Sequence, residues 1–190
     1  IKSTTGRKLT VCYRNGLMQC ATIWRLRSCK REMDMAFSNR MNILHINTND
    51  LRGGAAKVAY RLAEAQNRSG HHARLLGGYK ESSDPLSVAF PIERNSVVHQ
   101  LFRKNGWLDL DLEGSNKLTD YELVRNANIL HVHNLHGGYF NPVSLSKLAS
   151  MKPIVWTLHD MFPITGHCSY SFECDGWKRG CGNCPDLSIY

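Results

Sequence analysis

The sequence predicts an α/β fold with a parallel, doubly wound sheet and a cysteine-rich loop. Three observations support this class. Short apolar runs typical of strands alternate with helical patterns, a glycine pair follows the first strand, and polar residues stand at three of the strand ends. The 190 residues are enough for one domain with a buried core. No run of about 18 apolar residues occurs, so a membrane-spanning helix is not expected.

The first forty residues differ in charge from the rest of the chain. They hold nine Lys or Arg and two Asp or Glu (+7), whereas residues 41–190 hold fifteen and fourteen (+1). The apolar stretch from Leu17 to Trp24 loosely resembles a signal peptide, but basic residues follow it instead of small ones. We expect residues 1–40 to be a basic extension, disordered or not native, and the ordered domain to begin at Met41. Because the body is near neutral, binding to nucleic acid is not expected.

The opening unit of the domain is a strand, a glycine turn, a helix and a second strand. Residues 42–47 are predicted to be a strand, followed by a loop over residues 48–54. From Ala55 onward, apolar residues recur at i, i+3, i+4, i+7 and i+8, which is one face of a helix. Ser69-Gly70 is expected to end this helix, and residues 73–77 are predicted to be the second strand.

The middle of the chain is less regular. A loop is expected over residues 81–85, a helix over residues 96–104, and a short helix over residues 120–125. Between the last two, residues 107–116 alternate leucine with acidic residues and favour neither type.

The regular pattern returns near residue 128. A strand is predicted over residues 128–133 and a loop over residues 134–138. Asn141-Pro142 has the form of an N-cap followed by proline, so a helix is expected from there through Ala149. The next strand is predicted over residues 154–158.

Polar residues at three strand ends are the candidate site. These are Asn47, His133-Asn134 and His159-Asp160. The carboxyl ends of parallel strands share one edge of a sheet, so we expect these residues to meet there. Adjacent residues at a strand end point to opposite sides. We therefore expect His159 and Asp160 to have separate roles, one facing substrate and the other capping or orienting the next loop.

Two other patterns have both a functional and a simpler interpretation. Gly53-Gly54 at a helix N-terminus suits a phosphate, but a tight strand-to-helix turn needs the same residues. The Gly-x-Gly-x-x-Gly motif is absent and no acidic residue ends the second strand at Gly78 to bind a ribose, so no nicotinamide or flavin cofactor is expected. His131, His133 and His136 suggest a metal site, but no carboxylate stands at ligand spacing. We favour polar residues that line a binding crevice.

The cysteine cluster is the most specific pattern in the chain. Cys168, Cys174, Cys181 and Cys184 follow the last predicted strand, and the Cys-x-x-Cys spacing lets two sulfurs bind one metal. His167 is an alternative ligand. The loop is rich in glycine and poor in aliphatic residues, so burial alone cannot hold its shape. We expect a structural zinc ion, with disulfides or packed thiols as alternatives.

Several segments resemble the bacterial group 1 glycosyltransferases, which are retaining enzymes of the GT-B class. Residues 41–59 resemble the first strand, Gly-Gly-Ala loop and helix of that family, and residues 129–134 and 154–160 resemble two of its strand ends. Residues 165–185 resemble a subset that builds surface polysaccharides such as colanic acid. The resemblance covers residues 41–190.

The resemblance implies that residues 41–190 are the N-terminal, Rossmann-like domain of a two-domain enzyme, without its C-terminal donor domain. The complete enzyme would transfer a sugar, as a hexosyltransferase, from a nucleotide-sugar to a polysaccharide or lipid-linked acceptor. It would act in the cytoplasm or at the inner face of the membrane, with peripheral membrane contact left open. The domain alone is expected to be inactive. The alternatives are a non-catalytic sugar- or nucleotide-binding module and a zinc-stabilised interaction domain.

The resemblance also implies roles for the residues at the strand ends. Carried over by position, Gly53 and Gly54 approach the donor diphosphate or the acceptor. His133 and Asn134 line the acceptor side. Asp160 is expected to be a further substrate-binding residue. His159 is expected to contact the transferred sugar beside the reacting centre.

Overall fold

The computed structural model describes residues 40–184 except 91 and 94, and these described residues belong to one compact unit. The basic extension expected over residues 1–40 therefore lies, apart from Arg40, outside the described residues. Five strands form one parallel sheet in the order β3-β2-β1-β4-β5. From β1 the chain first adds strands on one side, β2 and β3, and then returns to add β4 and β5 on the other side. This reversal of strand order is the pattern of a doubly wound fold. The predicted fold class is confirmed.

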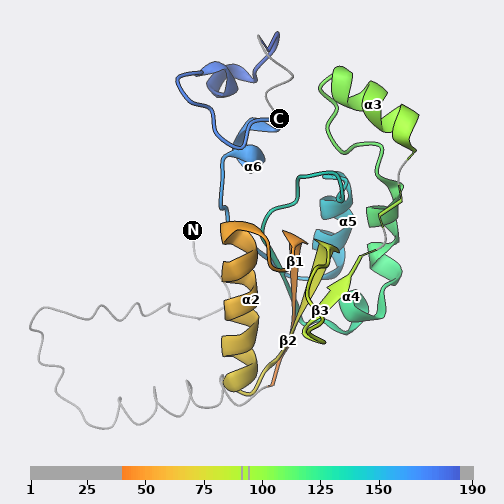
Figure 1. Cartoon of the computed structure of the whole chain (residues 1–190), viewed down its shortest axis with the longest axis vertical. Coiled ribbons are helices and arrows are strands. Elements are labelled where there is room, and N and C mark those ends of the chain that lie inside the picture. Colours follow the sequence, from red (N-terminus) through yellow and green to blue (C-terminus); the bar gives the residue numbers. More distant parts are fainter. Residues whose placement is uncertain (1–39, 91, 94, 185–190) are drawn as a thin grey trace, which may run out of the picture. The chain divides into compact units, whose positions relative to one another are not determined.

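Helices separate the strands along the chain except between β2 and β3 (Figure 1). The strands are β1 (Asn42–Asn49), β2 (His72–Tyr79), β3 (Ser87–Ala89), β4 (Ile129–Val132) and β5 (Ile154–Trp156). The helices are α2 (Gly53–Arg68), α3 (Ser96–Lys104), α4 (Glu122–Asn126), α5 (Ser144–Met151) and α6 (Phe162–Thr165), with 3-10 helices η1 (Glu113–Asp120) and η2 (Gly176–Arg179). None of the helices in this part of the chain is both long and apolar enough to cross a bilayer.

Several predicted boundaries were wrong for local reasons. The glycine pair opens α2 instead of preceding it. The helix expected from Asn141 begins at Ser144, because the Asn141 side chain accepts a hydrogen bond from the Val143 N–H and forms a turn before the helix. The last strand ends at Trp156, which pairs with Val132 at the end of β4.

Four elements were not predicted from the pattern, namely β3, η1, the four-residue helix α6 and η2. Strand β3 has only three residues at the edge of the sheet, too few to show an alternation. The ambiguous stretch before residue 117 runs into η1, in which Leu118 is buried, and the adjacent Leu112 is buried as well.

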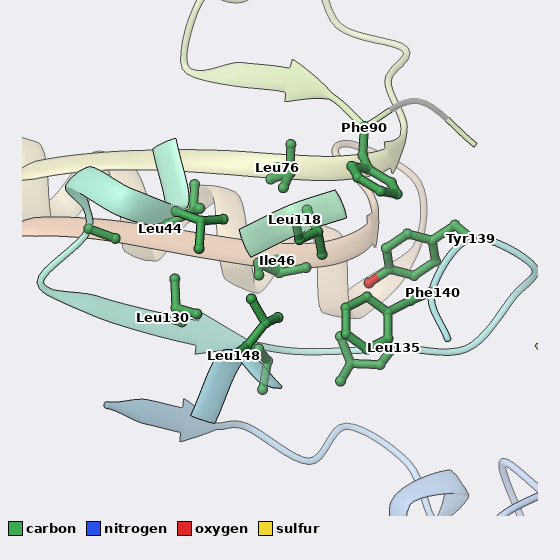
Figure 2. Close-up of a cluster of buried hydrophobic side chains, with 13 residues drawn as sticks. Leu44, Ile46, Leu76, Phe90, Leu118, Leu130, Leu135, Tyr139, Phe140 and Leu148 are labelled. Atoms are coloured by element: carbon green, nitrogen blue, oxygen red, sulfur yellow. The ribbon is translucent and has the colours of Figure 1, made fainter. Parts of the chain in front are cut away.

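One face of the sheet carries the main hydrophobic core. Leu44 and Ile46 of β1 and Leu130 and Val132 of β4 point into it, where they meet side chains from η1, α4 and α5 (Figure 2). The core extends past the strand ends through Leu135, Tyr139 and Phe140. A Cβ at Gly78 would overlap the ring of Tyr139, so this position in β2 must be glycine for the ring to pack.

Helix α2 covers the opposite face (Figure 1). Its buried residues are Ala56, Ala59 and Ala63, and side chains this small let the helix lie close to the sheet. Ile43 and Ala73 pack against Ala63 near the amino ends of the strands. Further along β1 and β4, histidines replace the apolar residues on this face, beginning with His45, whereas β2 keeps the buried Leu75.

Candidate functional site

The loops that follow β1 and β4 are tied together at the carboxyl edge of the sheet. The side-chain oxygen of Asn47 accepts the Asn134 N–H at 3.1 Å. Thr48 donates from its hydroxyl to the His136 carbonyl at 2.7 Å. These bonds cross the point where the strand order reverses, and parallel α/β proteins bind ligands in the crevice outside that point. The structure therefore brings Asn47 and Asn134 together as the sequence suggested.

The N-terminus of α2 stands directly after β1 at the same edge. Gly53 has a φ of +87°, a left-handed conformation that favours glycine. A Cβ on Gly53 or Gly54 would meet nothing within 4 Å, so the backbone there is open. Arg52 makes no capping bond and the first turn contains no acidic side chain. Within the described residues, no side chain accepts a hydrogen bond from the first N–H groups of this 16-residue helix, an arrangement that suits an anion.

A chain of hydrogen bonds runs through three histidines behind this edge. Nε2 of His159 lies 2.9 Å from Nδ1 of His133, and Nε2 of His133 lies 3.0 Å from Nδ1 of His45. The chain ends on α2, where Oε1 of Gln66 lies 2.7 Å from Nε2 of His45. His159 is thus connected to the helix through two buried rings.

Burial keeps the inner histidines neutral. Burial, with smaller contributions from neighbouring histidines, lowers the pKa of His45 to about 4 and that of His133 to about 3. The hydrogen bond to Gln66 partly opposes the shift at His45 by raising its pKa. Burial also lowers the pKa of His131, with a smaller contribution from His159. His131 stacks on His133 with ring centroids 4.4 Å apart, and its Nε2 lies 2.7 Å from the Thr157 hydroxyl.

The histidines that could hold a metal ion in the structure are not the three that the sequence suggested. Among the described residues, His45, His131 and His133 bring three ring nitrogens within 4.8 Å of one another. Both ring nitrogens of His45 and of His133 already take part in hydrogen bonds, so these rings would have to break bonds to bind a metal. His136 lies elsewhere and pairs with Asp160. The hydrogen-bonded arrangement is therefore the better description of this cluster.

Asp160 has structural partners at both carboxylate oxygens. Oδ2 lies 2.7 Å from Nε2 of His136, and Oδ1 accepts the Phe162 N–H at 3.0 Å at the start of α6. Asp160 and its neighbour His159 thus have different partners, since His159 forms its hydrogen bond with His133. In this arrangement Asp160 orients His136 and the following loop.

A cavity of about 420 Å³ opens beside His136. Its lining includes Tyr79, Asp109, Gly138 and Phe162. Asp109 is buried and has a φ of +61°, which is unusual for a residue with a side chain. Its carboxylate accepts the Gly138 N–H at 3.1 Å, and burial raises its pKa. A buried carboxyl on a strained backbone that lines a cavity is a candidate for ligand contact.

Another cavity, of about 650 Å³, lies at the opposite edge of the sheet. Asn42, His72 and Ala127 line it, next to the amino ends of the strands. Because ligands of such sheets bind outside the carboxyl ends, we assign the site to the smaller cavity and the strand ends beside it.

The four cysteines of the loop line a single cavity of about 260 Å³. Cys174 and Cys181 are exposed and carry free thiols, and Sγ of Cys168 lies 3.6 Å from Nδ1 of His167. Their sulfurs are not gathered at metal-binding distances, since the histidine group is the one so gathered in the described residues. Gly180, Cys181 and Gly182 all have positive φ, so the chain reverses sharply at the Cys-x-x-Cys pair.

Sequence reasoning missed three residues of this region: His45, Gln66 and Asp109. A signal for His45 was present, because Leu-His occurs in both β1 and β4 and the two histidines are direct neighbours in the sheet register. Nothing in the sequence distinguished Gln66 from other polar residues of its helix. Asp109 lay in the segment that favoured neither helix nor strand.

Comparison with known proteins gives two matches. The family described as Glycosyltransferase Family 4 matches residues 52–179. The putative colanic acid biosynthesis glycosyl transferase WcaC of Escherichia coli (strain K12) is 33% identical over 171 residues, which cover 79% of this chain and 41% of the relative. The chain thus spans less than half the length of this curated relative. No solved structure matches the chain.

Proposed function

Since this chain belongs to glycosyltransferase family 4, we propose that it forms the acceptor-side domain of an enzyme that transfers a sugar from a nucleotide-sugar during polysaccharide synthesis. One structural observation supports the location of the reacting groups within this domain. The uncapped N-terminus of α2 and the histidine chain that ends at His159 both lie at the carboxyl edge, where the strand order reverses. The complete enzyme would add a C-terminal domain that holds most of the donor.

Sugar transfer makes two demands that this edge can meet. The bond from the sugar to the diphosphate oxygen breaks while a bond to the acceptor oxygen forms, and the proton of the acceptor hydroxyl passes to an oxygen of the departing diphosphate. The N–H groups at Gly53 and Gly54 would stabilise the negative charge that grows on the departing diphosphate. His159 would contact the transferred sugar, and His133 would hold the His159 ring in place through their hydrogen bond.

The acceptor would occupy the cavity beside His136. Its lining combines a buried carboxyl, a histidine and the aromatic side chains of Tyr79 and Phe162. Saccharides are bound by such mixtures, because their hydroxyls form hydrogen bonds while their C–H faces pack on aromatic rings. Asp160 contributes by orienting His136, and Asn134 by its bond to Asn47.

We also propose peripheral contact with the inner face of a membrane that carries a lipid-linked acceptor. Helix α3 exposes Val97 (67%) and Leu101 (55%), and Trp107 after it is 54% exposed. Arg103 and Lys104 lie in its last turn. Apolar and basic side chains on one short helix suit the surface of an anionic bilayer. Sedimentation with anionic vesicles, compared with neutral ones, tests this part.

The cysteine loop would bind one structural zinc ion. Its four cysteines line one cavity, Cys181 lies within a sharp reversal of the chain, and the loop buries few apolar side chains. Zinc binding would draw the four sulfurs together into a closed tetrahedral site. Such a site has no open position for water, so the metal would stabilise the loop and take no part in transfer.

The decisive test is turnover by a complete enzyme that contains this domain. A panel of nucleotide-sugars would be incubated with lipid-linked saccharides, and release of nucleoside diphosphate would be followed together with product mass. We expect turnover with one donor class by the complete enzyme and none by residues 1–190 alone. Saccharide or nucleotide binding by the complete protein without any turnover would instead indicate a binding module.

A further inference from the structure

Three hydrogen bonds link Gln66 on α2 to His159 at the sheet edge, through His45 and His133. Their lengths are 2.7, 3.0 and 2.9 Å, and they join residues that are 21, 88 and 26 positions apart in the chain. His45 and His133 are fully buried, and the rings stack with centroids about 5 Å apart in successive pairs (5.3 Å for His45 and His133, 5.2 Å for His133 and His159). The geometry is that of a continuous row of rings which water does not interrupt.

Each inner ring, His45 and His133, donates one hydrogen bond along the row and accepts the other. A neutral imidazole has one N–H donor and one acceptor nitrogen, whereas an imidazolium has two donors. The pKa of His45 is lowered to about 4 and that of His133 to about 3, so both rings are neutral near pH 7. Once the donor nitrogen of one ring is fixed, the donor nitrogen of the next ring follows from it.

We propose that Gln66 is a positioning residue which, through His45 and His133, fixes His159 in the tautomer with its hydrogen on Nε2. In the amide orientation that the structure shows, Oε1 of Gln66 faces His45 and can only accept, so His45 carries its hydrogen on Nε2. Nδ1 of His45 then accepts from Nε2 of His133, and Nδ1 of His133 accepts from Nε2 of His159. The lone pair of Nδ1 is left on His159, and within the described part of the chain no hydrogen bond to that atom is present.

This tautomer determines what His159 can recognise. The inference rests on the proposed function in one respect, namely that His159 faces the transferred sugar. An Nδ1 lone pair accepts a hydrogen bond from a sugar hydroxyl. The opposite tautomer would present an N–H, which suits a phosphate or carbonyl oxygen instead. Gln66, although it belongs to the helix and not to the strand ends, would thereby select for a hydroxyl on the bound sugar.

The test measures the tautomers directly in the chain of residues 1–190. Two-bond proton–nitrogen NMR spectra of histidine rings distinguish hydrogen on Nε2 from hydrogen on Nδ1. Spectra would be recorded near pH 7 with a chelator present, which removes any metal from His45 and His133. The His159→Asn variant assigns the His159 signals. Gln66→Leu removes the acceptor, Gln66→Glu retains an acceptor oxygen, and Gln100→Leu makes the same change at an exposed position of α3.

We expect His159 to carry its hydrogen on Nε2 in the native chain, in Gln66→Glu and in Gln100→Leu. In Gln66→Leu, whose folding is checked by circular dichroism, the single tautomer should give way to a mixture. The proposal is overturned if His159 in the native chain carries its hydrogen on Nδ1, or if its tautomer is the same in Gln66→Leu. A changed tautomer with unchanged turnover of the complete enzyme would support the relay and contradict the proposed contact of His159 with sugar.

Discussion

His133 is the residue on which the site depends most closely. It is buried, both of its ring nitrogens have histidine partners, and its carbonyl accepts the indole N–H of Trp156 at 2.8 Å. His133 therefore connects β1 with β5. It also connects the residues under α2 with His159 at the carboxyl edge of the sheet. A residue bonded in this way can set the position of His159 without touching substrate itself.

Replacing His159 by alanine in the complete enzyme should lower kcat about a hundredfold, which corresponds to about 3 kcal/mol of transition-state stabilisation. The fold should be little affected, because His159 is only partly buried at the end of a strand. Steady-state kinetics and a thermal melt would be compared with those of His72→Ala, an exposed histidine next to the other cavity. Near-normal turnover would show that His159 is only structural.

Gly78→Ala should destabilise the domain by about 1–3 kcal/mol, because the added methyl group would overlap the buried ring of Tyr139. The measurement is urea denaturation followed by tryptophan fluorescence. Gly54→Ala is the matched control, since a Cβ there meets nothing within 4 Å and the backbone is not left-handed. Equal stability of the two variants would mean that Tyr139 can move out of the way.

At the scale of elements, α2 has three separate tasks. Its small buried residues Ala56, Ala59 and Ala63 set its distance from the sheet. Gln66, on its last turns, bonds to the histidine row, and its first turn presents open backbone N–H groups. The spacing of the alanines is visible in the sequence, while the other two tasks depend on what the helix lies against.

Gly54→Glu should weaken binding of a nucleoside diphosphate to the complete enzyme by about tenfold or more, because a carboxylate would occupy the anion site and repel phosphate. The same charge is favourable at a helix N-terminus, so stability should stay level or rise by about 0.3–1 kcal/mol. Calorimetric titration measures the affinity. Gly54→Gln adds the same bulk without the charge, and identical affinity for the two variants would argue against a phosphate at this position.

Cys181→Ser should reduce the zinc content of protein purified without chelator from about one ion per chain, because a tetrahedral site loses one of its four ligands. The measurement is elemental analysis, together with protease sensitivity of the loop. Cys20→Ser, in the first forty residues, is the control and should leave the zinc content unchanged. An absence of metal combined with four freely reacting loop thiols would refute both zinc and disulfides.

For the molecule as a whole, the two faces of the sheet differ in chemistry. One face buries aliphatic and aromatic side chains, and the other buries a row of histidines under α2. A buried histidine with a lowered pKa binds fewer protons when folded than when unfolded. Its contribution to stability is therefore complete above the unfolded pKa of about 6.5 and is lost as pH falls toward the folded pKa.

The free energy of unfolding should accordingly decrease between about pH 6.5 and pH 4, by up to about 1.4 kcal/mol per pH unit for each buried histidine. His45 and His133 account for this window, since their folded pKa values are about 4 and about 3. The groups that face them are His131, His159 and Gln66. Urea denaturation at several pH values gives the slope. His133→Asn should flatten it and His72→Asn should not; an unchanged slope in His133→Asn would contradict this origin.

Short-range patterns were enough to derive most of the fold. Apolar alternation located β1, β2 and β4, the i, i+3, i+4 pattern located α2, and Gly70 ended that helix with a φ of +89° as expected. Because parallel strands share one carboxyl edge, the same reasoning placed Asn47, His133 and His159 at a common edge. These results depend on backbone geometry and on neighbours a few residues apart.

Only the folded arrangement showed what those residues do together. The bonds of the histidine row span 21 to 88 positions, so they exist only once β1 and β4 are aligned in register and α2 lies across them. Burial under the helix lowers the pKa values, and no local pattern encodes that burial. Asp109 likewise lines its cavity only in the folded chain, because its own backbone is left-handed and its segment has no periodicity. Local sequence determined the elements and the edge at which they end, whereas tertiary packing decided which polar groups lose water and bond to one another there.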